Sequence, residues 1–132
     1  MTEAQMNALS ERIIGCAFKV SSALGCGFLE KVYENSLVHE LRKNGLKAEP
    51  QHPINVYYDD VLVGEFFADI LVEDTVLLEL KAANHNDIFT AQCLNYLKAT
   101  GKALCLLLNF VKPRLEINRY RGKGTLATDE HG

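Results

Sequence analysis

The chain has 132 residues, of which 48% are hydrophobic and 23% charged, and its formal net charge is −3 at pH 7. This is the composition of one folded domain, and it gives no reason to expect long disordered segments. No apolar run approaches the roughly 18 residues of a membrane span, and the N-terminus lacks the basic and apolar blocks of a signal peptide, so we expect a cytoplasmic protein without a membrane partner.

Two amphipathic helices are predicted at the start of the chain. A capping box at Thr2 and Gln5 precedes apolar residues at helical spacing, which predicts a helix over residues 3–24. A second helix is expected over about 29–44, because Gly45 suits the position just after a helix end. The glycines between the two helices indicate a helix stop, since no strand precedes them as a phosphate-binding loop would require.

Strands dominate the rest of the chain. Three β-rich segments, close enough in sequence to pair as antiparallel hairpins, are expected at about 52–58, 61–72 and 75–82. A helix over about 87–100 precedes a continuous apolar run over 103–109, which is typical of a strand buried on both faces. With a last short strand over 115–120, the order is α-α-β-β-β-α-β-β, an α/β domain over 1–123 followed by a flexible tail over 124–132.

The most informative feature is a group of charged residues inside two apolar strand segments. Asp69 interrupts the first segment, and Glu79 and Lys81 lie near the end of the next. Strand alternation turns Glu79 and Lys81 to one face of the sheet. Asp69 joins them if the connection over residues 73–75 is a three-residue loop or bulged turn, whereas a two-residue turn sends it to the other face.

Ionised groups are rarely buried without a charged partner or a metal, so this cluster is a candidate site. The alternative is a structural Glu–Lys pair on a solvated strand face. Two further polar residues favour a site. On a helical wheel Glu30 falls within an apolar stripe and should point inward, and Gln92 does the same on the later helix. Buried polar groups need partners, and these residues are the obvious partners for one another.

Charge is distributed unevenly along the chain. Between Lys98 and Lys123 seven basic residues are opposed only by Glu116. This basic segment could supply a rim that faces phosphates, although a solvated basic region explains the charge equally well.

Cysteine and histidine give no sign of a metal site. The four cysteines lack C-x-x-C spacing, lie among apolar residues and are interpreted as reduced core thiols: Cys16, Cys26, Cys93 and Cys105. The histidines lack ligand spacing, although His85 is close enough to Lys81 to reach the same cleft.

With these residues in this order, the chain resembles the restriction-endonuclease-like PD-(D/E)XK nuclease superfamily and, more closely, its GxxExxY family. The naming motif stands at Gly27-Phe28-Leu29-Glu30-Lys31-Val32-Tyr33. Further similar segments are Tyr57-Tyr58, Ala68-Asp69-Ile70-Leu71-Val72, Glu79-Leu80-Lys81-Ala82, Gln92 with Tyr96-Leu97, and Leu108-Asn109-Phe110. The match spans roughly residues 5–120, and Ala68 replaces the Pro of the superfamily's name. The implied fold is a central mixed β-sheet flanked by helices.

The resemblance implies a metal-dependent nuclease that hydrolyses phosphodiester bonds in DNA or RNA. Asp69 and Glu79, with the Leu80 backbone carbonyl, would hold Mg²⁺ or Mn²⁺. Lys81 would orient or deprotonate the attacking water and neutralise charge on the phosphate. Glu30 would be an additional ligand or a base beside the ligands, and Gln92 would position water, Lys81 or phosphate.

Two other functions stay open at this point. The first is a catalytically weak or inactive module on a nuclease fold that binds nucleic acid or regulates, because a fold does not guarantee an activity. The second is an unrelated structural or protein-interaction domain. A homodimer would suit a nuclease of this size, since one small domain presents one active site and cutting both strands usually takes two.

Overall fold

The computed structural model describes residues 1–84 and 86–123, and in them the helices and strands follow the predicted order. The expected tail over 124–132 and the expected approach of His85 to the cleft lie outside the described residues. The elements are α1 (Glu3–Leu24), α2 (Glu30–Lys43), β1 (Ala48–Tyr58), β2 (Val61–Val72), β3 (Val76–Lys81), α3 (Asn86–Thr100), β4 (Leu104–Asn109) and β5 (Glu116–Arg121).

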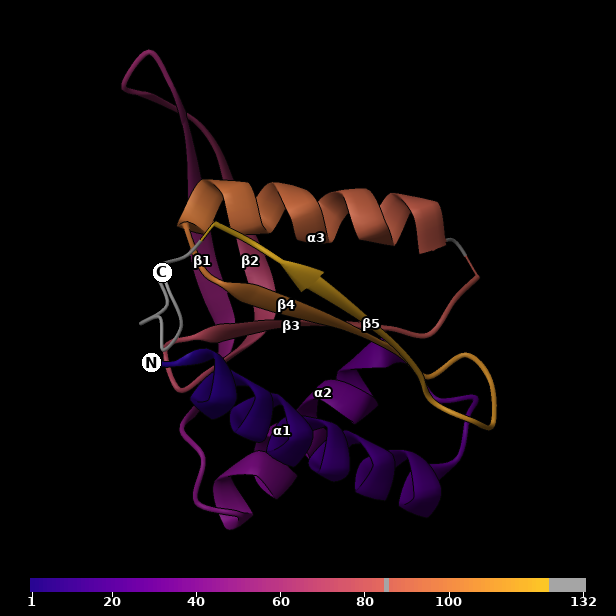
Figure 1. Cartoon of the computed structure of the whole chain (residues 1–132). Coiled ribbons are helices and arrows are strands. Elements are labelled where there is room, and N and C mark those ends of the chain that lie inside the picture. Colours follow the sequence, from indigo (N-terminus) through magenta and orange to yellow (C-terminus); the bar gives the residue numbers. More distant parts are fainter. Residues whose placement is uncertain (85, 124–132) are drawn as a thin grey trace.

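The strands form one mixed sheet in the order β1-β2-β3-β4-β5. Neighbouring strands run antiparallel except β3 and β4, which are parallel and are joined by the crossover helix α3. Figure 1 shows α1 and α2 on one face of the sheet and α3 on the other. The predicted α/β fold, a central mixed sheet flanked by helices, is therefore confirmed.

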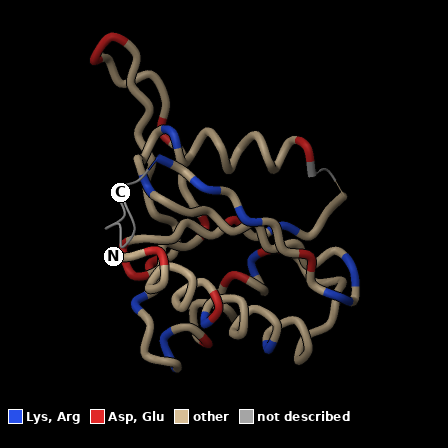
Figure 2. The backbone as a smooth tube through the Cα atoms, viewed as in Figure 1, with Lys and Arg blue, Asp and Glu red and all other residues tan. Residues whose placement is uncertain are grey.

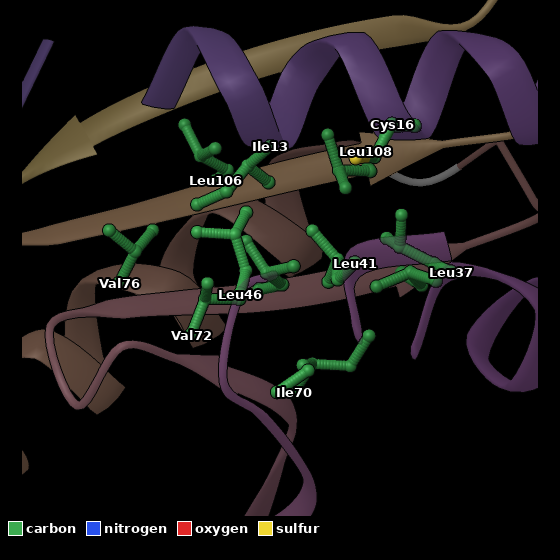
Figure 3. Packing of buried hydrophobic residues seen from close by; sticks show 14 of the residues in the cluster. Ile13, Cys16, Leu37, Leu41, Leu46, Ile70, Val72, Val76, Leu106 and Leu108 are labelled. Carbon is green, nitrogen blue, oxygen red and sulfur yellow. The ribbon is translucent and has the colours of Figure 1, made fainter. Parts of the chain in front are cut away.

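The core explains why β4 is apolar from Leu104 to Leu108. Leu106 and Leu108 pack beneath α1 and α2, in the cluster that Figure 3 shows around Ile13 and Leu41. The alternate residues of β4, among them Leu107, pack in a second cluster beneath α3. A strand covered on both faces favours apolar side chains throughout, and the polar residue of β4, Asn109, stands at its end, where its amide donates to the Ala83 carbonyl oxygen.

The first strand is longer than expected, because β1 begins at Ala48 rather than near residue 52. Pro50 and Pro53 weakened the strand pattern in the sequence. Since β1 is an edge strand, its prolines need not donate to a neighbour on its outer side.

The β1–β2 hairpin extends well beyond the rest of the sheet. β2 pairs with β3 only over Ile70 to Val72, so residues 53–67 pair only with each other, and this portion of the hairpin is called the arm below. Asp59 and Asp60 form its two-residue turn with positive φ angles of 51° and 62°, as a tight hairpin turn requires. Figure 1 shows the arm reaching past α3.

The expectation that all four cysteines lie in the core is wrong for one of them. Cys16, Cys93 and Cys105 are buried, but Cys26 is exposed in the connection between α1 and α2. This connection turns back over the end of the helices and has no covering layer. In the part of the chain that the structure describes, no helix is both long enough and apolar enough to span a membrane.

Tyr33 fixes the connection between α1 and α2. Its hydroxyl donates to the Gly25 carbonyl oxygen at 2.7 Å and accepts from the Phe28 backbone N–H at 3.2 Å. Its ring is stacked on Phe110, with centroids 4.3 Å apart. The tyrosine of the GxxExxY motif therefore has a structural role, and through the connection it sets where α2 begins.

We expect Tyr33→Phe to lower the free energy of unfolding by about 1–2 kcal/mol, because it removes a hydroxyl from two backbone partners while keeping the ring stack. Urea denaturation curves measure this change. Tyr58→Phe is the control, since the Tyr58 side chain is exposed, and it should shift stability by less than about 0.5 kcal/mol. Equal, small shifts in the two variants would show that the Tyr33 hydroxyl does not hold the connection.

Candidate active site

The structure places Asp69 beside Glu79. The β2–β3 connection spans three residues, and the pairs Leu71–Leu77 and Val72–Val76 set a register in which Asp69 lies opposite Glu79. Of the two turns considered, the three-residue connection is therefore the one found.

Beyond the last β2–β3 pair, side chains replace the backbone ladder. The Leu80 backbone N–H donates to Asp69 Oδ2 at 2.7 Å, and the Asp69 N–H donates to Glu79 Oε1 at 3.4 Å. The two strands separate where the two carboxylates meet. On this side of β3, the backbone of Leu80 is not paired with the backbone of β2 and can therefore contact a ligand.

The alternation of β2 is interrupted at Asp69. Ala68 and Leu71 both pack in the cluster beneath α3, whereas Ile70 packs on the other side of the sheet. Opposite Asp69 in the β1 register stands Gln51, with a positive φ of 54°. Local irregularities of this kind re-aim side chains and are common beside active sites.

Lys81 completes the group. Its Nζ lies 3.9 Å from Glu79 Oε2 and 4.9 Å from the centroid of the Phe89 ring. The carboxylate and the aromatic face hold the ammonium group on the α3 side of the sheet. Asp69, Glu79 and Lys81 are thus brought together as the sequence predicted.

Glu30 does not point into the core as expected. It is exposed, and its Oε2 accepts a hydrogen bond from the Ala82 backbone N–H at 3.4 Å. The helical wheel gave its direction around the helix, but residues 30–32 at the start of α2 are exposed, and burial begins only at Tyr33. Glu30 still lies at the end of β3, beside Ala82, the residue that follows Lys81.

The sequence reasoning missed Glu34, a buried acid of α2 one turn further on. Its Oε1 accepts from Gln51 Nε2 at 2.9 Å and its Oε2 from Lys31 Nζ at 2.8 Å. Glu34 belongs to the same apolar stripe of the wheel as Glu30, so the stripe could have identified it. Its negative charge acts on Asp69.

Gln92 is half-buried at the surface of α3 rather than inside the core. Its Nε2 donates to Tyr96 Oη at 2.9 Å. The buried face of α3 is formed by Cys93, Tyr96 and Leu97, and Gln92 lies at the border of that face. The structure places Gln92 on the wall of a cleft that also contains Lys81.

Both carboxyl groups have raised pKa values. Burial raises the pKa of Glu79 to about 9, helped by the negative charge of Asp69 and opposed by the ammonium of Lys81. Burial also raises the pKa of Asp69 to about 6; the Leu80 N–H lowers it and the charges of Glu34 and Glu30 raise it. The positive charge of Lys81 is therefore not enough to keep both carboxyl groups ionised at their ordinary pKa values.

In the metal-free protein, this pair should make stability depend on pH. The pKa of Glu79 is about 9 in the folded state and has the ordinary value of 4.5 in the unfolded chain. Between these two pH values Glu79 is protonated in the folded protein and ionised in the unfolded chain. The free energy of unfolding should then fall as pH rises from 6 to 8, by up to about 1.4 kcal/mol per pH unit for one proton.

Urea midpoints in EDTA at the two pH values measure this fall. Glu79→Gln removes the titrating group while nearly keeping its shape, so its midpoint should change much less between the two pH values. A wild-type midpoint that is constant or rises with pH would contradict the pKa assigned to Glu79.

The donor set suits a hard divalent cation. Within residues 1–84 and 86–123, no three side chains of His, Cys, Asp or Glu are grouped to hold one ion. Mg²⁺ does not need three, because it keeps several waters and binds proteins through one or two carboxylates. Two adjoining carboxylates with raised pKa values, beside a strand edge that has no strand partner, fit this requirement.

A cleft of about 930 Å³ lies between the arm and α3. Residues of four elements line it, among them Tyr57 of β1 and Phe66 of β2 in the arm, Lys81 of β3, and Phe89, Gln92 and Tyr96 of α3. Because Lys81 also contacts Glu79, the cleft leads to the carboxylate pair.

The basic segment does not form one phosphate-facing rim. Arg119 donates to Asn7 Oδ1 and Arg121 to Glu3 Oε2, each at 2.6 Å, so both are engaged with α1. Figure 2 shows the Lys and Arg residues of the segment spread over several elements. From this segment, Lys98 lines the cleft. The number of basic residues could be counted from the sequence, but the directions of their side chains could not.

The fold and this constellation define a class of protein. An aspartate and a Glu-x-Lys sequence on adjacent strands of a mixed sheet, with helices on both faces, are the features of a restriction-endonuclease-like nuclease domain. The chain belongs to the PD-(D/E)XK nuclease superfamily, whose family model matches residues 7–120.

Among solved structures, the chain is similar to that of an alkaline exonuclease from Laribacter hongkongensis. The sequence identity is 15% and the TM-score 0.44, over 80% of this chain and 76% of that one. None of the curated proteins compared with the chain matches it.

Proposed function

We propose that the protein is a metal-dependent nuclease that hydrolyses phosphodiester bonds of DNA or RNA at Asp69, Glu79 and Lys81. The observation that carries this proposal is the meeting of the two carboxylates where β2 and β3 separate, with the Lys81 ammonium 3.9 Å from Glu79. Membership of a nuclease superfamily supports it. The motif residues Gly27, Glu30 and Tyr33 support placing the chain in the GxxExxY family.

Asp69 and Glu79 would hold the cation, which is Mg²⁺ or Mn²⁺, together with the backbone carbonyl of Leu80. The N–H and C=O of one strand residue point to the same edge, and the Leu80 N–H points to Asp69, so its carbonyl faces the same gap. When bound, such a cation supplies Lewis acidity to the phosphate and lowers the pKa of a bound water.

Lys81 would act on the phosphate and the attacking water. Glu79 would hold the cation as the carboxylate, and the ammonium of Lys81 would donate to a phosphate oxygen or orient the water. Gln92 lines the same cleft and would position water or phosphate through its amide. Glu30, at the end of β3, would accept a proton or bind the cation through water.

A cleavage screen tests the proposal. Single-stranded, double-stranded and branched DNA and RNA are each incubated with Mg²⁺, Mn²⁺ or EDTA, and products are resolved on denaturing gels. We expect products only with a divalent cation. Binding without cleavage under every condition would instead support a module that binds nucleic acid and does not turn over. If the protein cuts both strands of duplex DNA, we propose that it does so as a homodimer, because each domain presents one active site.

A further inference from the structure

The cleft beside the candidate site has aromatic walls that a catalytic group alone does not require. Tyr57 and Phe66 on the arm line this cleft and are 61% and 47% exposed. The Phe66 ring lies 6.1 Å from that of Tyr96 on α3 and is tilted by 43°. The rings leave aromatic faces open to a flat ligand.

The polar residues of the cleft suit the other parts of a nucleotide. Asn55 and Asn95 present side-chain amides, which can both donate and accept hydrogen bonds at base edges. Lys98 lines the same cleft and offers a positive charge for a phosphate. Lys81 lines it too and lies beside Glu79, so the cleft and the candidate site share a residue.

We propose that this cleft binds unpaired nucleotides, with bases stacked on Phe66 and Tyr57, and leads their strand to Lys81. In a duplex each base face is covered by the next base pair, so stacking on protein rings requires unpaired bases. This inference rests on the proposed nuclease function and names its substrate class: a single-stranded end or an unpaired segment of DNA or RNA. The cleft is continuous with the candidate active site through Lys81, and Lys81 and Lys98 give it positive charge. Both features favour a nucleic-acid strand as the occupant over a second copy of the chain.

The arm offers a matched control. Tyr58 and Phe67 are the sequence neighbours of the two cleft residues and are as exposed, at 71% and 53%, but they do not line the cleft. A substitution at Tyr58 or Phe67 therefore changes the same kind of side chain on the same element without touching the proposed binding surface.

Phe66→Trp gives the full chain its sole tryptophan, because the natural sequence has none. The variant is titrated in EDTA with oligothymidylate, with oligouridylate and with a blunt duplex of equal length. We expect saturable quenching of tryptophan emission by a single strand and little by the duplex. A preference between oligouridylate and oligodeoxyuridylate, which differ only in the 2′-hydroxyl, then identifies the sugar. Phe67→Trp should respond weakly to all of these nucleic acids.

Alanine variants measure the contribution of each ring by fluorescence anisotropy of a labelled oligothymidylate. Tyr57→Ala and Phe66→Ala should each weaken binding by about 10-fold or more, and Tyr58→Ala and Phe67→Ala by less than about twofold. Equal losses in both pairs, equal affinity for the duplex, or no quenching would overturn the proposal. So would self-association that depends on Tyr57 and Phe66 and that oligonucleotide does not displace, since a second copy would then cover the cleft.

These measurements use no cation, so they separate the two proposals. Quenching without cleavage in any metal supports the cleft and counts against the nuclease function. Cleavage of duplex and single strands at equal rates, unaltered in Phe66→Ala, counts against the cleft and leaves the nuclease function standing.

Discussion

Lys81→Ala is expected to lower the rate of phosphodiester cleavage by about 100-fold or more while the protein stays folded and still binds a divalent cation. The reason is the position of the ammonium, 3.9 Å from Glu79 Oε2 and held over the Phe89 ring, beside the proposed cation and not among its ligands. Lys81 is proposed to stabilise the negative charge that develops on the phosphate in the transition state. Its removal should therefore lower the rate of cleavage and have much less effect on cation binding.

The measurement is the initial rate of cleavage of a labelled oligonucleotide under saturating Mg²⁺. Lys43→Ala is the control, because Lys43 lies on the outer side of α2 in an ion pair with Glu40, and its rate should match wild type. Activity of Lys81→Ala within a few-fold of wild type would mean that Lys81 only supports the structure.

The second large effect concerns stability and needs no knowledge of the substrate. The Asp69 and Glu79 carboxyl groups meet in a buried position, and burial together with their mutual repulsion raises the pKa of Glu79. Asp69→Asn should therefore raise the melting temperature in EDTA, since it removes a charge that burial and the charges of Glu34 and Glu30 disfavour, and it keeps an oxygen that accepts from the Leu80 N–H.

Wild type should gain stability when Mg²⁺ is added, by about 2.7 kcal/mol when the ion is at roughly 100 times its dissociation constant. Asp69→Asn should lose most of this gain. Four melting curves, of both proteins in EDTA and in excess Mg²⁺, measure the difference, and Asp60→Asn at the turn of the arm is the control. If Asp69→Asn lowers stability equally in both buffers and wild type ignores Mg²⁺, then Asp69 is a packed structural residue.

The central part of the site could be predicted from the sequence because the signal lies within short segments of the chain. A charged residue in an apolar strand segment is conspicuous, so Asp69, Glu79 and Lys81 were identified, and the alternation of the strand placed Glu79 and Lys81 on one side. Whether Asp69 joined them depended on one turn. The three-residue connection found in the structure decided it.

The helical residues were predicted less well, because a helical wheel gives the direction of a side chain but not what covers it. Glu30 and Glu34 share one stripe of α2, yet only Glu34 lies under the sheet and is buried. Gln92 was assigned to the buried face of α3 but lies on the wall of the cleft.

The cleft itself could not be predicted from local patterns. It exists because β2 extends beyond its pairing with β3, so that the arm stands opposite α3. Strand lengths across a sheet depend on pairing between distant segments, and neither periodicity nor composition records them. The same reason explains the basic segment, whose residues are close in sequence but contact different elements.

Binding of Mn²⁺ tests the central claim most directly, because the ion gives an electron paramagnetic resonance signal that falls when it binds. Wild type is titrated at pH 8 beside the double variant Asp69→Asn with Glu79→Gln, both without nucleic acid. Our account predicts that wild type binds Mn²⁺ at a saturable site, that Mg²⁺ displaces it, and that the double variant does not bind it. Equal binding by the two proteins, or no binding by wild type, would contradict the assignment of Asp69 and Glu79 as the cation site.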